Sequence, residues 1–283
     1  MTDIVFRPRK EVNKISKKGK PRDVKAGILL PIPYRAAVSS LVLHMLYELL
    51  NSLEDVVAYR FVYDVDEDAV ESLDIDTNLR NLDVLLISAS FELDYINIAK
   101  ILLHLKLLPK QKGKTKPLVV VGGLAPTANP LPLCEIADAV VIGEAEEVIE
   151  EIVYAAKDQN PSKILEDLKC LALPPFDHKV KRCYVEDLDS AYHPVKQVYS
   201  VEEEPVFGHG IRVELSRGCP YLCAFCMEAH ILYPFRYRSY ARVWNIIERG
   251  LEFSKIVRRA VFYSLSFYSI PYSDILIDKL VSE

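Results

Sequence analysis

Short apolar runs alternate with longer amphipathic segments between residues 26 and 156, and this alternation constrains the fold more than any other feature. Residues 84–87 and 118–121 are uninterrupted apolar runs, which are typical of central parallel strands covered on both faces. Residues 34–51 carry apolar side chains at helical spacing. Further strands are expected at 26–30, 56–63 and 138–142, and further helices after Asp94 and Gly143. The sequence therefore predicts an α/β domain with a doubly wound parallel sheet.

Glycines follow two of the predicted strands directly: Gly122 and Gly123 after one, and Gly143 after the next. Ligands of doubly wound sheets bind beyond the carboxyl ends of the strands, where glycine lets the backbone approach them closely. The three glycines are therefore candidate cofactor contacts, with tight turns as the alternative. Three acids, Glu144, Glu146 and Glu147, are expected in the first turn of the following helix, where they would suit the helix dipole but repel a phosphate. Because no G-x-G-x-x-G motif occurs either, a conventional NAD site is not expected.

Three cysteines, Cys219, Cys223 and Cys226, follow an alternating strand-like segment in a C-x3-C-x2-C pattern. A four-iron cluster held by three cysteines has one iron free to bind another molecule. The alternatives are a Cys3His zinc site that uses His230, a disulfide, and three unrelated buried thiols. A structural zinc or an electron-carrying cluster would make the protein a non-enzymatic metal-binding protein. Since an electron carrier is expected to have four cysteines per cluster, the open iron favours an enzyme.

The cysteine loop, with Phe225 before its last cysteine, resembles the cluster loop of the radical S-adenosylmethionine (radical SAM) superfamily. The resemblance implies that the three cysteines bind a [4Fe-4S] cluster, that SAM chelates the fourth iron, and that Phe225 lies beside the adenine. One electron, from a reductant such as ferredoxin or flavodoxin, would then cleave SAM and start radical chemistry. Methyl transfer, methylthiolation and rearrangement are the implied reactions, on a substrate that the sequence does not identify.

Arginines near the cysteine loop are candidate contacts to the SAM carboxylate or to an anionic substrate, with surface ion pairing as the alternative. Position favours Arg217 and Arg238 over Arg212 and Arg236. Residues 234–239 also resemble the segment that follows the cluster loop in methylthiotransferase-like members of the superfamily.

Residues 81–156 resemble the cobalamin-binding-like domain that precedes many radical SAM domains, most clearly at 121–130 and 143–147. The D-x-H-x-x-G motif, which supplies an axial histidine in many cobalamin proteins, is absent. The resemblance therefore implies either cobalamin bound without a protein imidazole or a domain that keeps only the fold. Three other cysteines, Cys134, Cys170 and Cys183, are too dispersed for a second cluster motif and are expected to be ordinary buried thiols.

Four segments are expected along the 283 residues. They are a basic arm (1–24), a Rossmann-like, cobalamin-binding-like domain (25–157), a proline-interrupted connector (158–207) that could form a small hairpin, and the first βα units of a TIM-type radical SAM barrel (208–283). A barrel needs roughly 30 residues per βα unit, so the last segment suffices for only two units. The chain is therefore expected to be a truncated piece of a longer protein, with uncertain activity of its own.

Residues 1–25 hold nine Lys or Arg against three Asp or Glu. Such a run can bind RNA, which would fit an RNA-modifying, methylthiotransferase-like enzyme, or it can stay solvated or fold back on an acidic face. Six cysteines without a signal-like N-terminus favour a reducing cytoplasm, and no apolar run reaches the roughly 18 residues of a membrane span. The expected protein is a cytoplasmic radical SAM enzyme.

Overall fold

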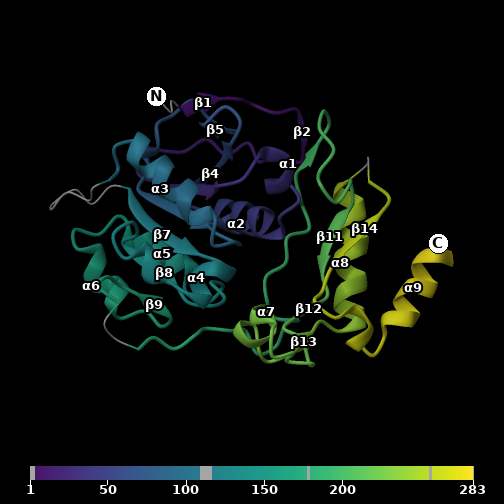
Figure 1. Ribbon diagram of the computed structural model, residues 1–283. Helices are drawn as coiled ribbons and strands as arrows, with labels where there is room; N and C mark the ends of the chain where they lie inside the picture. Colours follow the sequence, from purple (N-terminus) through teal and green to yellow (C-terminus); the bar gives the residue numbers. More distant parts are fainter. Residues whose placement is uncertain (1–3, 109–116, 177–178, 255–256, 283) are drawn as a thin grey trace.

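The computed structural model describes residues 4–108, 117–176, 179–254 and 257–282 (Figure 1). Residues 110–116, whose lysine-rich sequence predicts a basic surface loop, lie outside these ranges. Within them, no helix is both long and apolar enough to cross a membrane.

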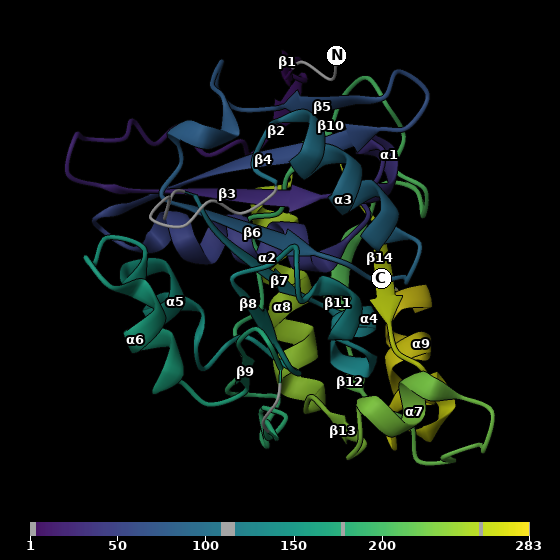
Figure 2. The same cartoon turned by 60° about the vertical axis from the view of Figure 1, so that its left-hand side comes forward.

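An eight-stranded sheet occupies the first two thirds of the chain, with the strand order β1-β5-β4-β3-β6-β7-β8-β9 (Figure 2). Its five central strands are all parallel. They are β3 (Val24–Leu30), β4 (Val56–Asp64), β6 (Val84–Ser88), β7 (Leu118–Gly122) and β8 (Ala139–Val141). From β3, the chain first adds β4 on one side and then adds β6, β7 and β8 on the other side, which is the strand order of flavodoxin-like sheets. This confirms the predicted doubly wound α/β fold and places a topological switch point between β3 and β6.

Three short strands that the sequence did not predict complete the sheet on its two sides. They are β1 (Ile4–Phe6), β5 (Ala69–Ser72) and β9 (Leu171–Ala172). Both β5 and β9 run antiparallel to their inner neighbours β4 and β8. Strand β9 comes from the predicted connector, so the sheet extends beyond the segment expected to form it.

Helices cover both faces of the sheet, which explains the uninterrupted apolar character of its central strands. One buried cluster joins the sheet to α2 (Leu41–Ser52) and α5 (Ile149–Ala155), and the other joins it to α3 (Asp94–His104) and α4 (Leu124–Ala128). The remaining short helices here are α1 (Tyr34–Ala37), α6 (Pro161–Glu166), η1 (Leu79–Asn81) and η2 (Leu131–Leu133).

Two helix predictions were wrong in detail. The single helix expected over 34–51 is divided into α1 and α2, which are separated by Val38, Ser39 and Ser40. The helix after Gly143 begins only at Ile149, so the acids at 144–147 precede it and do not occupy its first turn. The carboxylates of Glu144 and Glu146 bind arginines instead, as described below.

The last part of the chain contains the parallel pair β11 (Ile211–Glu214) and β14 (Ala260–Tyr263), connected through α8 (Tyr240–Phe253). Val243, Ile246 and Ile247 of α8 pack on Ile211 and Val213 of β11. The antiparallel pair β12 (Ser216–Arg217) and β13 (Arg236–Tyr237) brackets the cysteine loop and α7 (Met227–Ile231). The chain continues through η3 (Phe267–Ser269) to α9 (Ser273–Ser282). This arrangement matches the expected first βα units of a barrel.

The hairpin expected within the connector is not present among its described residues, because its two halves pair with other parts of the chain. Cys183 forms a parallel bridge with Gly143 at the edge of the sheet. Strand β10 (Tyr199–Ser200) pairs with β2 (Glu11–Val12) of the N-terminal arm.

The N-terminal arm folds back on acidic side chains, which was one of the alternatives for its basic run. Arg7 and Arg9 each approach a carboxylate oxygen of buried Glu71 to 2.5 Å. Within the arm, Glu11 is fully buried and lies 2.6 Å from the guanidinium of buried Arg60, which also binds Asp74 at 2.8 Å. RNA binding by the arm stays a prediction, but several of its cations are already paired with protein carboxylates.

We predict that Glu11→Gln lowers the free energy of unfolding by about 3 kcal/mol, because it leaves a buried guanidinium short of a carboxylate. The measurement is urea denaturation at neutral pH. Glu202→Gln is the matched control, since Glu202 pairs with Lys10 at the exposed surface and should change stability by less than about 0.5 kcal/mol. Equal effects of the two substitutions would contradict the prediction.

Candidate functional site

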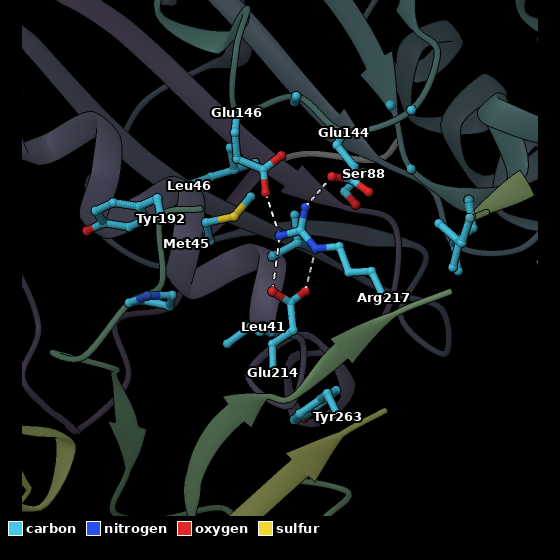
Figure 3. Close-up of a pocket in the computed structure, with 18 of the residues that line it drawn as sticks. Leu41, Met45, Leu46, Ser88, Glu144, Glu146, Tyr192, Glu214, Arg217 and Tyr263 are labelled. Carbon is cyan, nitrogen blue, oxygen red and sulfur yellow. Dashed lines mark hydrogen bonds and ion pairs between the residues drawn. The ribbon is translucent and has the colours of Figure 1, made fainter. Parts of the chain in front are cut away.

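A cavity of about 630 Å³ lies between the carboxyl edge of the large sheet and the β11–β14 pair (Figure 3). One wall comes from α2 and from the ends of β6, β7 and β8, and the other comes from residues 214–218 and 261–265. In doubly wound sheets, ligands bind beyond the carboxyl ends of the strands at the switch point. Here the switch point lies between β3 and β6, and α2 follows β3 in the sequence. Most of the lining is apolar, including Leu41, Met45, Leu46, Val141 and Phe262.

Arg217 lies at one side of this cavity with carboxylates on three sides of its guanidinium (Figure 3). Its Nε is 2.8 Å from Glu214, its Nη1 is 2.7 Å from Glu144, and its Nη2 is 2.6 Å from Glu146. Glu214 ends β11, whereas Glu144 and Glu146 belong to the loop after β8. The arginine therefore joins the two parts of the molecule.

Two more arginines extend this network. Arg236 Nη2 is 2.7 Å from Glu144 Oε1, and Arg238 Nη2 is 2.6 Å from Glu214 Oε2. Arg238 is fully buried and also donates to the carbonyl of Ala191 at 3.1 Å. We refer to Arg217, Arg236, Arg238, Glu144, Glu146 and Glu214 as the Arg–Glu network. Its three positive and three negative side chains balance.

The electrostatics keep two carboxylates of the Arg–Glu network, Glu144 and Glu214, ionised. Burial alone would raise the pKa of Glu214, but the charges of Arg217 and Arg238 outweigh it and lower this pKa to about 2. Burial likewise opposes ionisation of Glu144, and hydrogen bonds and charge from Arg236 and Arg217 hold its pKa below the ordinary value. Burial would lower the pKa of Arg217, but its three carboxylates raise it. The network thus brings charged groups to the cavity wall without a net charge.

His193 supports Glu214 from the connector. Its Nε2 accepts the backbone N–H of Glu214 at 3.1 Å, and its Nδ1 lies 3.0 Å from the carbonyl of Pro194. Burial, together with the nearby charge of Arg238, lowers the pKa of His193 to about 3. The ring is therefore neutral at physiological pH and acts as an acceptor toward β11.

The three predicted glycines all line the cavity, but protein atoms account for the conformations of two of them. Gly123 and Gly143 have φ values of +120° and +104°, and a Cβ atom would lie 2.2 Å from the carbonyl oxygen of Ala89 or Cys183, respectively. Gly143 N–H donates to the Thr127 hydroxyl at 3.0 Å, which links the two loops. Tight chain packing therefore explains Gly123 and Gly143, and contact of the three glycines with a cofactor stays a prediction.

The cysteine loop lies between β12 and α7, next to the residues at 216–218 that line the cavity. Cys219 and Cys226 are half-buried, Cys223 is exposed, and all three thiols are free. Phe225 is 91% exposed, so its ring is available to a ligand. Gly218, at φ +78°, begins the loop where a Cβ atom would lie 2.7 Å from the carbonyl oxygen of Leu232.

Among the described residues, no three His, Cys, Asp or Glu side chains are arranged to hold a metal ion. His230 directs its Nε2 to the carbonyl of Cys223, 3.2 Å away. The donor set nevertheless fits an iron–sulfur cluster chemically, because three free thiols share one short, partly exposed loop. These thiols would have to turn toward a common centre to hold it.

The expectation of ordinary thiols was wrong for two of the dispersed cysteines. Cys170 and Cys183 form a disulfide, whereas Cys134 is free and half-buried. Sequence spacing does not reveal this pair, since the connector brings Cys183 back to the sheet edge only in the folded chain.

Sequence reasoning missed the places of Glu214 and His193 in this site, and it assigned Glu144 and Glu146 to the first turn of a helix that begins only at Ile149. The one local signal was Glu214 at the end of an apolar strand and three residues before Arg217. The partners on the β8 loop are far away in the sequence, at a separation of 73 residues for Glu144 and Arg217.

Known proteins resemble this chain in sequence and in fold. Residues 42–173 match the family described as radical SAM proteins, N-terminal. An uncharacterised protein of Methanocaldococcus jannaschii is 28% identical over 239 residues, which cover 83% of this chain and 48% of that protein. The chain thus spans about half the length of this relative. The structure of OxsB, a cobalamin-dependent S-adenosylmethionine radical enzyme with aqua-cobalamin bound, is similar over 92% of this chain and 37% of OxsB. The TM-score is 0.58 at 16% identity, which establishes similarity of fold.

Stability is expected to fall below neutral pH because His193 is buried in its neutral form. Its folded pKa of about 3 lies below its ordinary value, so the unfolded chain takes up the proton first as pH decreases. Between pH 7.5 and pH 5 this single group should lower the free energy of unfolding by about 2 kcal/mol. The measurement is denaturation at both pH values, and His193→Gln should reduce the difference between them by that amount. An unaltered difference in the His193 variant would refute the assignment.

Glu144 and Arg236 are expected to be energetically coupled, because each buried charge lacks full compensation without the other. A double-mutant cycle with Glu144→Gln and Arg236→Gln should give a coupling energy of about 1–3 kcal/mol in thermal or denaturant unfolding. The control cycle uses exposed Glu147→Gln with Arg236→Gln and should give a value near zero. Additive effects in the first cycle would show that the ion pair contributes nothing.

Proposed function

Because residues 42–173 match the N-terminal family of radical SAM proteins and the fold is similar to that of a cobalamin-dependent radical SAM enzyme, we propose that this chain binds a [4Fe-4S] cluster and SAM and starts radical chemistry on a substrate in the cavity between its two parts. Cys219, Cys223 and Cys226 would hold the cluster. One observation carries the proposal: three free thiols lie on one loop that begins at the cavity wall, beside an exposed aromatic ring. The cluster with SAM supplies one-electron cleavage and radical formation when bound.

The surrounding residues would position the cysteine loop and exclude water from the reaction. Arg217 immediately precedes Gly218 and Cys219, and its three carboxylate partners fix the beginning of the loop. Arg238, buried and paired with Glu214, fixes the residue that ends β11. We propose that both arginines act mainly as positioning residues. Direct contact of either guanidinium with the SAM carboxylate would require exchange of an existing carboxylate partner.

The apolar part of the cavity would bind uncharged parts of a ligand. Its aliphatic and aromatic lining favours burial of apolar groups, and the charges along its wall are paired with one another. Exclusion of water protects reactive intermediates from side reactions. The specific substrate, and the choice among methyl transfer, methylthiolation and rearrangement, are not determined by these features.

Cobalamin is a second proposed cofactor at the carboxyl edge of the sheet. The described lining of the cavity contains no histidine. His44, on α2, has both ring nitrogens engaged, Nε2 with the Val38 carbonyl at 3.0 Å and Nδ1 with the Val198 N–H at 3.3 Å. We therefore propose that cobalamin would bind here without a protein imidazole ligand.

The test is anaerobic reconstitution with iron and sulfide, followed by EPR of the reduced protein with and without SAM. A [4Fe-4S] signal that changes shape on addition of SAM is expected, because SAM occupies the open iron. Alanine substitution of Cys219, Cys223 or Cys226 should abolish the signal, while Cys134→Ala, which removes a free thiol elsewhere, should preserve it.

Two results would contradict the proposal in different ways. A [4Fe-4S] EPR signal that is unchanged by SAM would contradict SAM binding by this chain. It would favour an electron-carrying or structural role for the cluster. Stoichiometric zinc with no cluster would make the cysteine loop a zinc site and remove the iron–sulfur chemistry altogether.

A further inference from the structure

The Cys170–Cys183 disulfide lies where the connector returns to the edge of the sheet. Cys170 directly precedes β9, and Cys183 lies beside Gly143 in a parallel bridge. Both residues are buried, with exposed fractions of 2% and 7%. The disulfide therefore connects two segments that flank the loop after β8.

Backbone hydrogen bonds from both cysteines hold the residues that lead to Glu144. Ile142 N–H donates to the Cys170 carbonyl at 2.8 Å, and Cys183 N–H donates to the Ile142 carbonyl at 3.0 Å. Glu144 N–H in turn donates to the Cys183 carbonyl at 3.0 Å. The disulfide thus joins the two segments that position residues 142–144.

The segment that follows Cys183 contacts the Arg–Glu network directly. Val185 N–H donates to Glu144 Oε2 at 2.8 Å, and the Val185 carbonyl accepts a hydrogen bond from Arg236. Glu144 then binds Arg217, which precedes the cysteine loop. A continuous set of contacts therefore runs from the disulfide through Glu144 to the start of that loop.

A second cavity lies beside the disulfide. It has a volume of about 940 Å³, and both Cys170 and Cys183 contribute to its lining. Its lining carries charges of both signs, from Lys169, Lys179, Lys181 and Arg182 and from Glu147, Glu166, Glu186 and Asp187. Disulfide exchange proceeds by attack of a thiolate on one of the two sulfurs, so a dithiol reductant would approach the bond from this cavity.

We propose that Cys170 and Cys183 form a reversible redox-modification site that controls the order of the Glu144 segment and, through Arg217, of the cysteine loop. Reduction by a dithiol breaks the S–S bond, transfers two electrons and two protons to give two thiols, and leaves the reductant as a disulfide. The reduced connector gains conformational freedom, because the covalent closure of its loop is lost. The consequence for a cluster rests on the proposed function, whereas the loosening itself does not.

The experiment compares the oxidised and the dithiothreitol-reduced forms of the 283-residue chain, both free of cluster, by hydrogen–deuterium exchange. Differential alkylation and peptide mass mapping first establish the state of each cysteine. Reduction should speed exchange at the amides of Glu144 and Val185 and at residues 214–219 by at least about tenfold, with strand β3 unaffected. Cys170→Ser should exchange fast with or without dithiothreitol, and Cys134→Ser should behave like the unaltered chain.

Two outcomes would overturn the inference. Complete alkylation of Cys170 and Cys183 in air-exposed, unreduced protein would show that the disulfide does not form. Unchanged exchange at 214–219 after verified reduction would show that the disulfide does not act on the cysteine loop. Neither result depends on cluster assembly, so failure of the proposed radical SAM function is detected separately by the EPR experiment.

Discussion

The guanidinium of Arg217 and its three carboxylate partners are the interaction on which the candidate site depends. Removing these charges from water costs several kcal/mol per ion, and the arrangement is favourable only because each charge has close partners of opposite sign. Glu144 and Glu146 come from the loop after β8, and Glu214 comes from the end of β11. The Arg–Glu network therefore fixes the distance between the two walls of the cavity.

A second buried ion cluster, around Arg60, connects the N-terminal arm to the large sheet. Arg60 in β4 binds Glu11 and Asp74, and the paired strands β2 and β10 lie beside it. In both clusters, charged side chains specify which segments meet, because an unpaired partner would leave a buried charge uncompensated. Apolar packing supplies the bulk of the core but discriminates less sharply between alternative pairings.

Much of the fold was predictable because the responsible signals are local. Uninterrupted apolar runs predicted the central strands, and helical periodicity predicted most of the covering helices. Helix boundaries and the short outer strands were not predicted from the sequence. Helix α2 starts only after a break at 38–40, and β9 forms where the connector pairs with β8. Strand β9 depends on the free edge that β8 offers in the folded sheet, which local sequence does not describe.

The sequence by itself determined the alternation of strands and helices and the grouping of Cys219, Cys223 and Cys226 on one loop, since both follow from spacing along the chain. Only the tertiary structure decided that Glu144 meets Arg217, and that Cys183 returns to Cys170. The physical reason is that ion pairs and disulfides act over a few ångströms in space. Their partners are selected by the folded path of the connector and the sheet, which no local pattern records.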